Sequence, residues 1–417
     1  MGELCGTSDG PAARVLEEGE REMNISMNLE ESITKYDQSK TYIGYTLFAP
    51  IGGTDVWLID MGGRVVWGWK MLYRPGCDAM LLPSGNLLYA GHVDGDGLAS
   101  VEGSAGVVLE VDWRGNVIWK YEDEYLHHTF CRMDNGNSLV LKWIKTPDYI
   151  ATKVKGGIPG TEPGGVLWSD CIQEVTRNGE VIWEWVAFEH LNPEVDAICP
   201  LCERTFWPGL NACSVLPDGN ILTSFHRTHN VAIIDKSTGD VKWRWGLGEI
   251  AHQNAPSFLM NGNILIFDNG LHPHLYPMGF SRIVEVDPHS SEMVWAYEDS
   301  PRTNFYSSIM GSCQRLPNGN TLICEATGGR IFEITSGGSV VWEFLNPFFH
   351  ESAIYGRNNM LSRAYRYGPD YEGLRGNTVE GAGFQPELQR KGGLGNRGAR
   401  MPKDERAVRR RIDSLGY

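Results

Sequence analysis

The sequence predicts an all-β protein, a six-bladed β-propeller, on three observations. A strand motif ending in tryptophan recurs six times, a second turn-and-strand motif lies between successive copies, and the 417 residues include 50 glycines and 14 tryptophans. Many short strands joined by tight turns use these residues more than a helical bundle does. Self-similarity at a regular spacing indicates a propeller or another repeat architecture.

The first motif is a glycine-led or polar turn followed by a short apolar stretch and a tryptophan. Its copies are GGRVVWGW, RGNVIWKY, NGEVIWEW, TGDVKWRW, SSEMVWAY and GGSVVWEF. Successive copies are separated by about 50 to 60 residues, which is close to the length of one propeller blade. The marker tryptophans are Trp67, Trp119, Trp183, Trp243, Trp295 and Trp342.

The second motif is a tight turn, mostly of the N-G-N type, followed by an apolar strand, and it fills every gap between markers. Its copies are LPSGNLLYA, MDNGNSLVL, LPDGNILTS, LMNGNILIF and LPNGNTLIC. A third short strand, such as VVLEVD or RIFEIT, precedes each tryptophan strand. Each antiparallel unit has two faces to bury, so neighbouring units must stack, and closing the ring removes the exposed end faces.

The first unit lacks an inner strand of its own. It contains YTLFAP, TDVWLID and VVWGWK, with no further strand ahead of them. The segment NNMLSRAYRY at 358–367 is expected to complete this unit and so to latch the ring. A β-sandwich pair or a solenoid built from the same tryptophan strands is the alternative fold.

The periodic part of the chain sets the expected domain organisation. We predict the propeller at residues 43–371, an acidic N-terminal extension at 1–42 and a basic C-terminal tail at 372–417. A basic tail beside an acidic body favours docking on its own or a neighbouring subunit over RNA binding. A homo-oligomer formed through the terminal extensions is consistent with this pattern.

Composition limits the partners and the compartment. The net charge of −15 disfavours nucleic acid and anionic membranes, because such a surface repels phosphate, and leaves a small-molecule substrate as the expected partner. No long apolar run and no secretory signal are found, which favours a cytoplasmic protein. The nine cysteines are expected to be reduced, and the CPLC pair, Cys199 and Cys202, is not expected to bind zinc because no second pair accompanies it.

Polar residues gather where the inner strands should begin, at the mouth of the central channel. Most of the eleven histidines lie at or beside these positions. We predict catalytic roles for some of these residues and substrate-binding roles for others. The first group is His128, His252 and Asn254, and the second is Asp78, His127 and Asn211.

The segments that follow the turns add further side chains. SFHRTHN contributes His226 and Arg227 as catalytic candidates, and several imidazoles with an acid could bind a divalent metal, Mn²⁺ or Zn²⁺, that activates water. The expected ligands are His229, Asp268 and His272, with His274 nearby. The alternative for each is an ordinary surface histidine, or an aspartate that caps its own turn.

The repeats, HRTHNVAIID, NGNILIFDNG and the NPFF…RAYRYGPDY ending together resemble the arylsulfate sulfotransferase-like family over residues 43–371. The resemblance implies a six-bladed propeller. For the true sulfotransferases of the family it implies transfer of a sulfuryl group between phenols through a sulfo-histidine, assisted by other channel histidines and an arginine.

Carried over residue by residue, the family's nucleophilic histidine falls thirteen residues ahead of the Phe of FDNG, where this chain has Asn254. An amide nitrogen cannot take up the sulfuryl group as an imidazole can. His128 matches the family's first channel histidine, His226 or Arg227 falls at the arginine position, and Asn211 replaces another histidine.

Three functions follow from these residues. The first is an enzyme that acts on a small cyclic or phenolic substrate by metal-assisted hydrolysis or lyase chemistry with the channel histidines. The second is an aryl sulfotransferase in which His128 or His252 replaces the missing nucleophile. The third is a non-catalytic propeller that serves as a scaffold.

Overall fold

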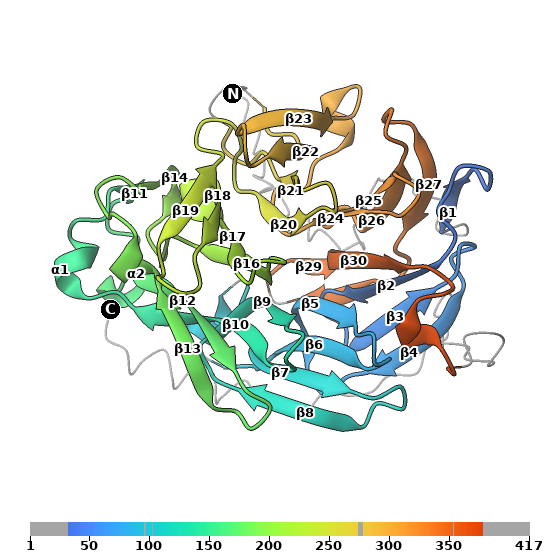
Figure 1. Ribbon diagram of the computed structural model, residues 1–417, viewed down its shortest axis with the longest axis horizontal. Coiled ribbons are helices and arrows are strands. Elements are labelled where there is room, and N and C mark those ends of the chain that lie inside the picture. Colours follow the sequence, from blue (N-terminus) through green and yellow to red (C-terminus); the bar gives the residue numbers. More distant parts are fainter. Residues whose placement is uncertain (1–31, 96, 102, 274–277, 353, 378–417) are drawn as a thin grey trace, which may run out of the picture.

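A computed structural model describes residues 32–95, 97–101, 103–273, 278–352 and 354–377. Six antiparallel sheets are arranged around a central axis as the blades of a β-propeller, which confirms the predicted fold (Figure 1). The predicted N-terminal extension and basic tail lie mostly outside the described residues, as does His274. Among the described residues, no helix has both the length and the apolar character needed to cross a bilayer.

Blades 2 to 6 follow one another along the chain, each beginning with its innermost strand, whereas blade 1 takes its innermost strand from the C-terminal part of the chain. Blade 1 consists of β30 (Leu361–Tyr367), β2 (Tyr45–Pro50), β3 (Asp55–Ile59) and β4 (Val65–Lys70). Blade 2 consists of β5 (Arg74–Leu81), β6 (Leu87–His92), β7 (Gly106–Val111) and β8 (Val117–Glu122). Blade 3 consists of β9 (Leu126–Arg132), β10 (Ser138–Lys145), β12 (Trp168–Val175) and β13 (Val181–Val186), with β15 (Phe206–Trp207) beside β12.

The remaining blades have the same order. Blade 4 consists of β16 (Leu210–Val215), β17 (Ile221–Phe225), β18 (Asn230–Ile234) and β19 (Val241–Trp245). Blade 5 consists of β20 (Asn254–Phe258), β21 (Ile264–Asp268), β22 (Arg282–Asp287) and β23 (Glu292–Tyr297). Blade 6 consists of β24 (Ser312–Arg315), β25 (Thr321–Glu325), β26 (Arg330–Ile334) and β27 (Val340–Leu345), with β1 (Ile33–Tyr36) on its outer edge.

Both described ends of the chain close the ring. β30 pairs with β2 as the inner strand of blade 1, as predicted for residues 358–367, and β1 pairs with β27 of blade 6. The ring therefore uses residues that precede position 43, where the sequence placed its start. It also extends past 371, because Leu374 of η5 (Glu372–Leu374) belongs to the hydrophobic core of blades 1 and 2. The six inner strands contact one another in a closed circle.

The marker tryptophans join neighbouring blades through their indole N–H groups. Trp119 donates to the Arg177 carbonyl of the next blade at 2.9 Å, and Trp342 of blade 6 donates to Met61 of blade 1 at 2.9 Å. Blade 1 makes the equivalent bond with Trp69 in place of its marker. Trp119 and Trp342 are buried. The other four markers are only half-buried, because the outer edges of their blades face solvent: Trp67, Trp183, Trp243 and Trp295.

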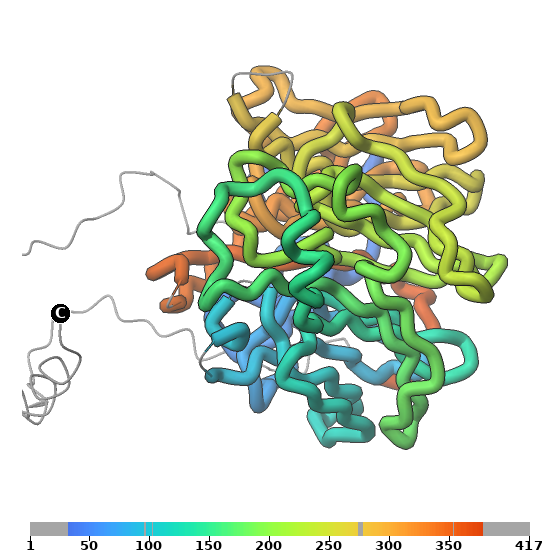
Figure 2. Tube along the Cα trace, turned by 90° about the vertical axis from the view of Figure 1, so that its left-hand side faces the viewer, coloured from blue at the N-terminus to red at the C-terminus, as the bar shows by residue number. Residues whose placement is uncertain are grey.

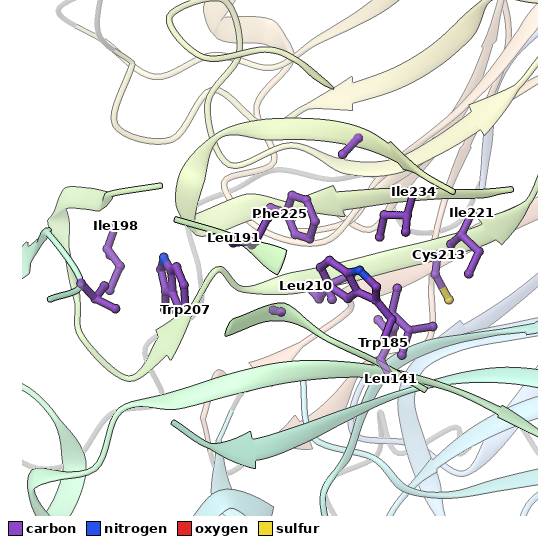
Figure 3. Close-up of a cluster of buried hydrophobic side chains, with 14 of the residues drawn as sticks. Leu141, Trp185, Leu191, Ile198, Trp207, Leu210, Cys213, Ile221, Phe225 and Ile234 are labelled. Carbon is purple, nitrogen blue, oxygen red and sulfur yellow. The ribbon is translucent and has the colours of Figure 1, made fainter. Parts of the chain in front are cut away.

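Side chains from adjacent blades pack into continuous cores. The core between blades 3 and 4 combines Leu141 and Trp185 from one blade with Phe225 and Ile234 from the other (Figure 3). Trp207, from the segment that connects these blades, extends the same core. Because each blade shares its apolar face with its neighbour, no blade is stable in isolation.

Blade 3 carries long insertions beside this core. They contain α1 (Asp148–Ala151), β11 (Gly156–Ile158), η2 (Pro163–Gly165), α2 (Ala187–His190) and β14 (Ile198–Glu203). These elements lie on the side of the ring that faces the viewer in Figure 2. The other short elements are η1 (Gly97–Ser100), η3 (His226–Thr228), η4 (Arg302–Asn304) and the hairpin of β28 (His350–Ser352) and β29 (Gly356–Asn358). β14 contacts η3, so the insertion reaches the loop that carries the HRTHN motif.

Candidate active site

A cavity of about 320 Å³ opens where the inner strands begin. This volume suits one small organic ligand. Every blade contributes to its lining, so the cavity lies at the mouth of the central channel. The contributing residues, from blade 1 to blade 6, include Arg363, Cys77, His128, Asn211, Asn254 and Met310. Phe206, Leu201 and Leu271 add apolar surface.

His128 ends a chain of three buried or half-buried groups. Its Nδ1 lies 2.9 Å from Nδ1 of His127, and His127 Nε2 lies 3.3 Å from Oδ1 of Asp170. Neither His127 Nε2 nor Asp170 Oδ1 has a hydrogen-bond partner among the described residues, so their 3.3 Å separation is a close contact without hydrogen-bond geometry. The second carboxylate oxygen of Asp170 accepts bonds from the Gly209 and Leu210 amides at 2.8 and 3.0 Å.

Packing fixes the orientation of this chain. The His127 ring stacks on Trp143 at 4.6 Å, and Trp143 stacks on Phe206 at 4.6 Å. A Cβ at Gly103 would lie 2.4 Å from the His128 ring, so only glycine allows the ring its position. These contacts fix the orientation of the His127 and His128 rings relative to each other.

Burial keeps the imidazoles neutral. Desolvation, followed by the charges of Arg363 and Arg227, lowers the pKa of His128 to about 3, although one edge of the ring reaches the cavity. Desolvation also lowers the pKa of His127 well below its ordinary value. Conversely, burial raises the pKa of Asp170 to about 7. The hydrogen bonds from the Leu210 and Gly209 amides lower this pKa but do not outweigh the burial. A neutral imidazole keeps the lone pair that a nucleophile or base requires.

His226 and Arg227 occupy η3 at the edge of the same cavity. His226 Nδ1 lies 2.7 Å from the Gly209 carbonyl, which only accepts, so Nδ1 carries the proton and Nε2 keeps a lone pair. Burial, followed by the charge of Arg227, lowers the pKa of His226 well below its ordinary value. Arg227 forms no ion pair with any described residue. Its guanidinium is therefore available to an anionic ligand.

Asp78 and Arg363 form a polar hub across the channel. Arg363 Nη1 donates to Asp78 Oδ2 at 2.7 Å, and Thr129 and Tyr365 donate to the same carboxylate at 2.6 and 2.9 Å. Asp78, expected to bind substrate, is thus occupied by protein partners. Sequence reasoning missed Arg363, although the RAYRY segment that contains it was recognised as the latch of the ring.

The two channel asparagines belong to this hub. Asn254 Oδ1 accepts from its neighbour Ala255 at 2.9 Å and lies 3.4 Å from Arg363 Nη2. The Asn211 side chain donates to the Gln253 carbonyl at 2.9 Å, and the backbone carbonyl of Asn211 accepts from Arg363 Nη2 at 3.3 Å. Both line the cavity, and neither offers a nitrogen lone pair for covalent chemistry.

The three residues expected to hold a metal do not meet in one place. Asp268 forms an ion pair with Arg282 at 2.8 Å and accepts the Ala251 amide at 2.9 Å, so its carboxylate is engaged within blade 5. The His229 ring packs against His252 with centroids 4.5 Å apart. His272 alone of the three belongs to a cluster of potential ligands.

That cluster contains Cys199, Cys202, His252 and His272, whose ligand atoms all lie within 4.8 Å of one another. Both cysteines are free thiols. The CPLC pair was given no metal role because a second ligand pair is missing nearby in sequence. The fold supplies that pair from two loops of blade 5. His252, expected to be catalytic, is thus engaged with Cys202 at 3.4 Å.

Backbone strain is concentrated at the site. Four of its histidines have a positive φ, a conformation that non-glycine residues rarely adopt. They are His128 at 53°, His229 at 55°, His252 at 57° and His272 at 55°. Such conformations persist where the surrounding structure over-determines them, and they occur most often at functional sites.

Comparison with solved structures supports the fold. A protein of unknown function from Bacteroides caccae is 16% identical, with a TM-score of 0.51, over 78% of this chain and 98% of that chain. Streptogramin B lyase is 10% identical, with a TM-score of 0.41, over 80% of this chain and 97% of that chain. At 16% identity the likeness to the Bacteroides caccae protein concerns the fold alone.

Comparison of sequences identifies the family. None of the curated proteins compared with the sequence matches it. A model of the arylsulfotransferase (ASST) family matches residues 93–347, which is more than half of the chain and includes the Asp170–His127–His128 chain, η3 and the Cys/His cluster. The chain is an arylsulfotransferase-like propeller and belongs to the arylsulfotransferase family.

Proposed function

We propose that this protein transfers a sulfuryl group from an aryl sulfate to a phenol, with His128 as the nucleophile. The observation that carries the proposal is the succession of Asp170, His127 and His128 beside the guanidinium of Arg227, which forms no ion pair with a described residue. A nucleophile, a base that contacts it and a third group that orients the base form a recurring arrangement in covalent catalysis. Membership of the arylsulfotransferase family agrees with this chemistry.

The order of the groups along this chain would select the reactive form of His128. When Asp170 is ionised, it would attract the N–H on Nε2 of His127 across the 3.3 Å contact, so Nδ1 of His127 would accept the proton on Nδ1 of His128. Nε2 of His128 then keeps its lone pair for the substrate. Because burial holds the pKa of His128 at about 3, this imidazole stays neutral at physiological pH.

The cavity suits an anionic aryl ester. Arg227 would bind the sulfate oxygens and stabilise the charge that develops on them during transfer. Leu201, Phe206 and Leu271 would contact the ring. The adjacent Arg363 is already paired with Asp78, so it would add positive potential without releasing its partner.

In the first step His128 Nε2 attacks sulfur, an N–S bond forms and the S–O bond to the aryl group breaks. The aryl oxygen leaves with the bonding electron pair as a phenolate. The positive charge on the sulfo-imidazole is shared through His127 with Asp170. In the second step the oxygen of the acceptor phenol attacks sulfur, its proton passes to His226 Nε2, and the N–S electron pair returns to His128.

Metal-assisted hydrolysis or lyase chemistry is the less supported alternative. Its expected ligands Asp268 and His229 are engaged elsewhere, and the Cys/His cluster offers four protein ligands to one ion. A catalytic zinc site has three protein ligands and keeps one position for water or substrate. The geometry therefore favours the histidine route.

The test is the intact mass of the protein after exposure to p-nitrophenyl sulfate. We expect an addition of about 80 Da, the mass of SO₃, that is lost when phenol is added. His128→Ala should lack this adduct, turn over about 10²-fold more slowly or worse, and melt near the wild-type temperature. His190→Ala, which removes a histidine outside the cavity, is the matched control.

The proposal fails if the wild type turns over without an adduct, or if His128→Ala still forms one. Turnover that is lost on chelation and restored by a divalent ion, with no adduct at any stage, would instead favour the metal-assisted alternative.

A further inference from the structure

We propose that Cys199, Cys202, His252 and His272 form a structural zinc site that clasps the insertion of blade 3 to blade 5. The four ligand atoms come from three separate segments and meet within 4.8 Å. Both cysteines lie on β14, His252 lies between β19 and β20, and His272 lies between β21 and β22.

The distances are those of a tetrahedral ion. With bonds of about 2.3 Å to sulfur and about 2.0 Å to nitrogen, a tetrahedral zinc site places sulfur and nitrogen about 3.5 Å apart. The observed separations are 3.4 Å for Cys202 Sγ to His252 Nε2 and 3.6 Å from each cysteine Sγ to His272 Nδ1. Three of the four sulfur–nitrogen pairs therefore agree with one geometry, and the remaining ligand pairs lie within 4.8 Å.

Hydrogen bonding alone accounts poorly for this arrangement. A thiol sulfur can donate one proton and accept weakly, but Nδ1 of His272 has only one proton or one lone pair, so it cannot bond fully to Cys202 and to a second thiol at once. Cys199 also directs its sulfur at the same nitrogen of His272. One cation accepting electron pairs from all four atoms satisfies every contact together.

The donor set selects the metal. Two thiolates and two imidazoles are the ligands of structural Zn²⁺ sites, whereas Mn²⁺ prefers carboxylate, carbonyl and water oxygens. Of the two metals considered from the sequence, zinc therefore fits these residues. Two thiolates also balance the double charge of the ion, so the site adds no net charge beside Arg227.

The position of the site gives it a structural role at the cavity. Cys202, His252 and His272 all line the cavity, and β14 contacts η3, which carries His226 and Arg227. An ion held by β14 and the two blade 5 loops would fix the insertion over η3. The four protein ligands fill the coordination sphere, so the ion would have no open position for substrate. It would hold the cavity wall in place, and the substrate would react with His128 and His226.

The first experiment measures metal in the purified full-length chain, independently of any activity. We expect about one zinc per chain by elemental analysis. Cys199→Ser, Cys202→Ser and His272→Asn should each lose it. Cys131→Ser and His190→Asn, which alter a half-buried cysteine and a histidine outside the cluster, should keep it.

A second measurement is needed because a ligand variant could misfold. X-ray absorption at the zinc edge of the wild type should show two sulfur and two nitrogen neighbours at about 2.3 and about 2.0 Å. Hydrogen exchange should show faster uptake at 198–203 after chelation, with the blade strands unchanged. Wild-type protein without zinc after refolding in excess Zn²⁺, zinc without sulfur neighbours, or full zinc content in Cys202→Ser would overturn the proposal. None of these results depends on sulfuryl transfer.

Discussion

Asp170 does not line the cavity, yet it determines which nitrogen of His128 is reactive. It lies on β12, the third strand of blade 3, and reaches His128 only through His127. A carboxylate accepts a proton from His127 and leaves the His128 Nε2 lone pair free. A protonated carboxyl would donate instead, which would reverse the direction of donation at both contacts and place a proton on His128 Nε2. Asp170 is a positioning residue in this scheme.

We therefore expect formation of the sulfo-enzyme to accelerate as pH rises through about 7. Burial raises the pKa of Asp170 to about 7, so the productive, ionised form is present above that pH and is lost below it. His128, with a pKa of about 3, contributes no titration near its ordinary value. The measurement is the single-turnover rate with p-nitrophenyl sulfate from about pH 5 to about pH 9.

Asp170→Asn is the control for this pH profile. Two backbone amides face Oδ2, so the carboxamide should turn its oxygen toward them and its NH₂ toward His127. That orientation fixes the unproductive form, and we expect a loss of about 10²- to 10⁴-fold with no pH dependence near 7. A flat wild-type profile, or a variant that retains the wild-type profile, would contradict the role of Asp170.

At the scale of the strand, the tryptophan motif joins each blade to the next. The indole N–H crosses to a turn of the following blade, while the ring covers the apolar edge between them. The extent of burial varies around the ring. Trp342 at the junction of blades 6 and 1 is fully covered, whereas Trp243 keeps part of its ring in solvent. The same motif thus stabilises different junctions to different extents.

We expect Trp342→Ala to destabilise the fold by about 3 to 5 kcal/mol, because it leaves a large cavity and removes the bond to Met61. Trp243→Ala should cost clearly less, since part of its ring already contacts water. Denaturant unfolding of both variants checks the order. Equal losses, or a smaller loss for Trp342→Ala, would show that the junctions do not differ as their burial indicates.

At the scale of the whole molecule, strands distant in sequence close the ring. β30 completes blade 1, and Arg366 on this strand contacts the buried Glu333 of blade 6 at 3.4 Å. The same strand carries Arg363 into the channel. Closure of the ring and the position of Arg363 in the cavity therefore both depend on β30.

A chain that ends at Asn358 should lose cooperative unfolding, because blade 1 would expose β2 and the junction with blade 6 would open. A chain that ends at Asn377 keeps every described strand and should melt like the full chain. Thermal melts followed by near-ultraviolet circular dichroism compare the two. A cooperative transition in the shorter chain would show that β30 is dispensable for closure.

The sequence alone determined the number of blades, the order of strands within them and the strand that latches the ring. These features are repeated locally, as turn residues and alternating side chains, and so can be identified without coordinates. It also indicated that His128, His226 and Arg227 lie near the channel mouth, because each lies at a defined distance in sequence from a turn of the repeat.

Only the tertiary structure decided which side chains meet. Asp170 reaches His127 across blade 3, Arg363 enters from the last strand, and the CPLC pair meets two blade 5 histidines 50 and 73 residues from its members. No spacing in the chain encodes these distances. They follow from the closure of the ring, which brings six separate strand starts to one small opening, and from the path of an irregular insertion that has no counterpart in the repeat.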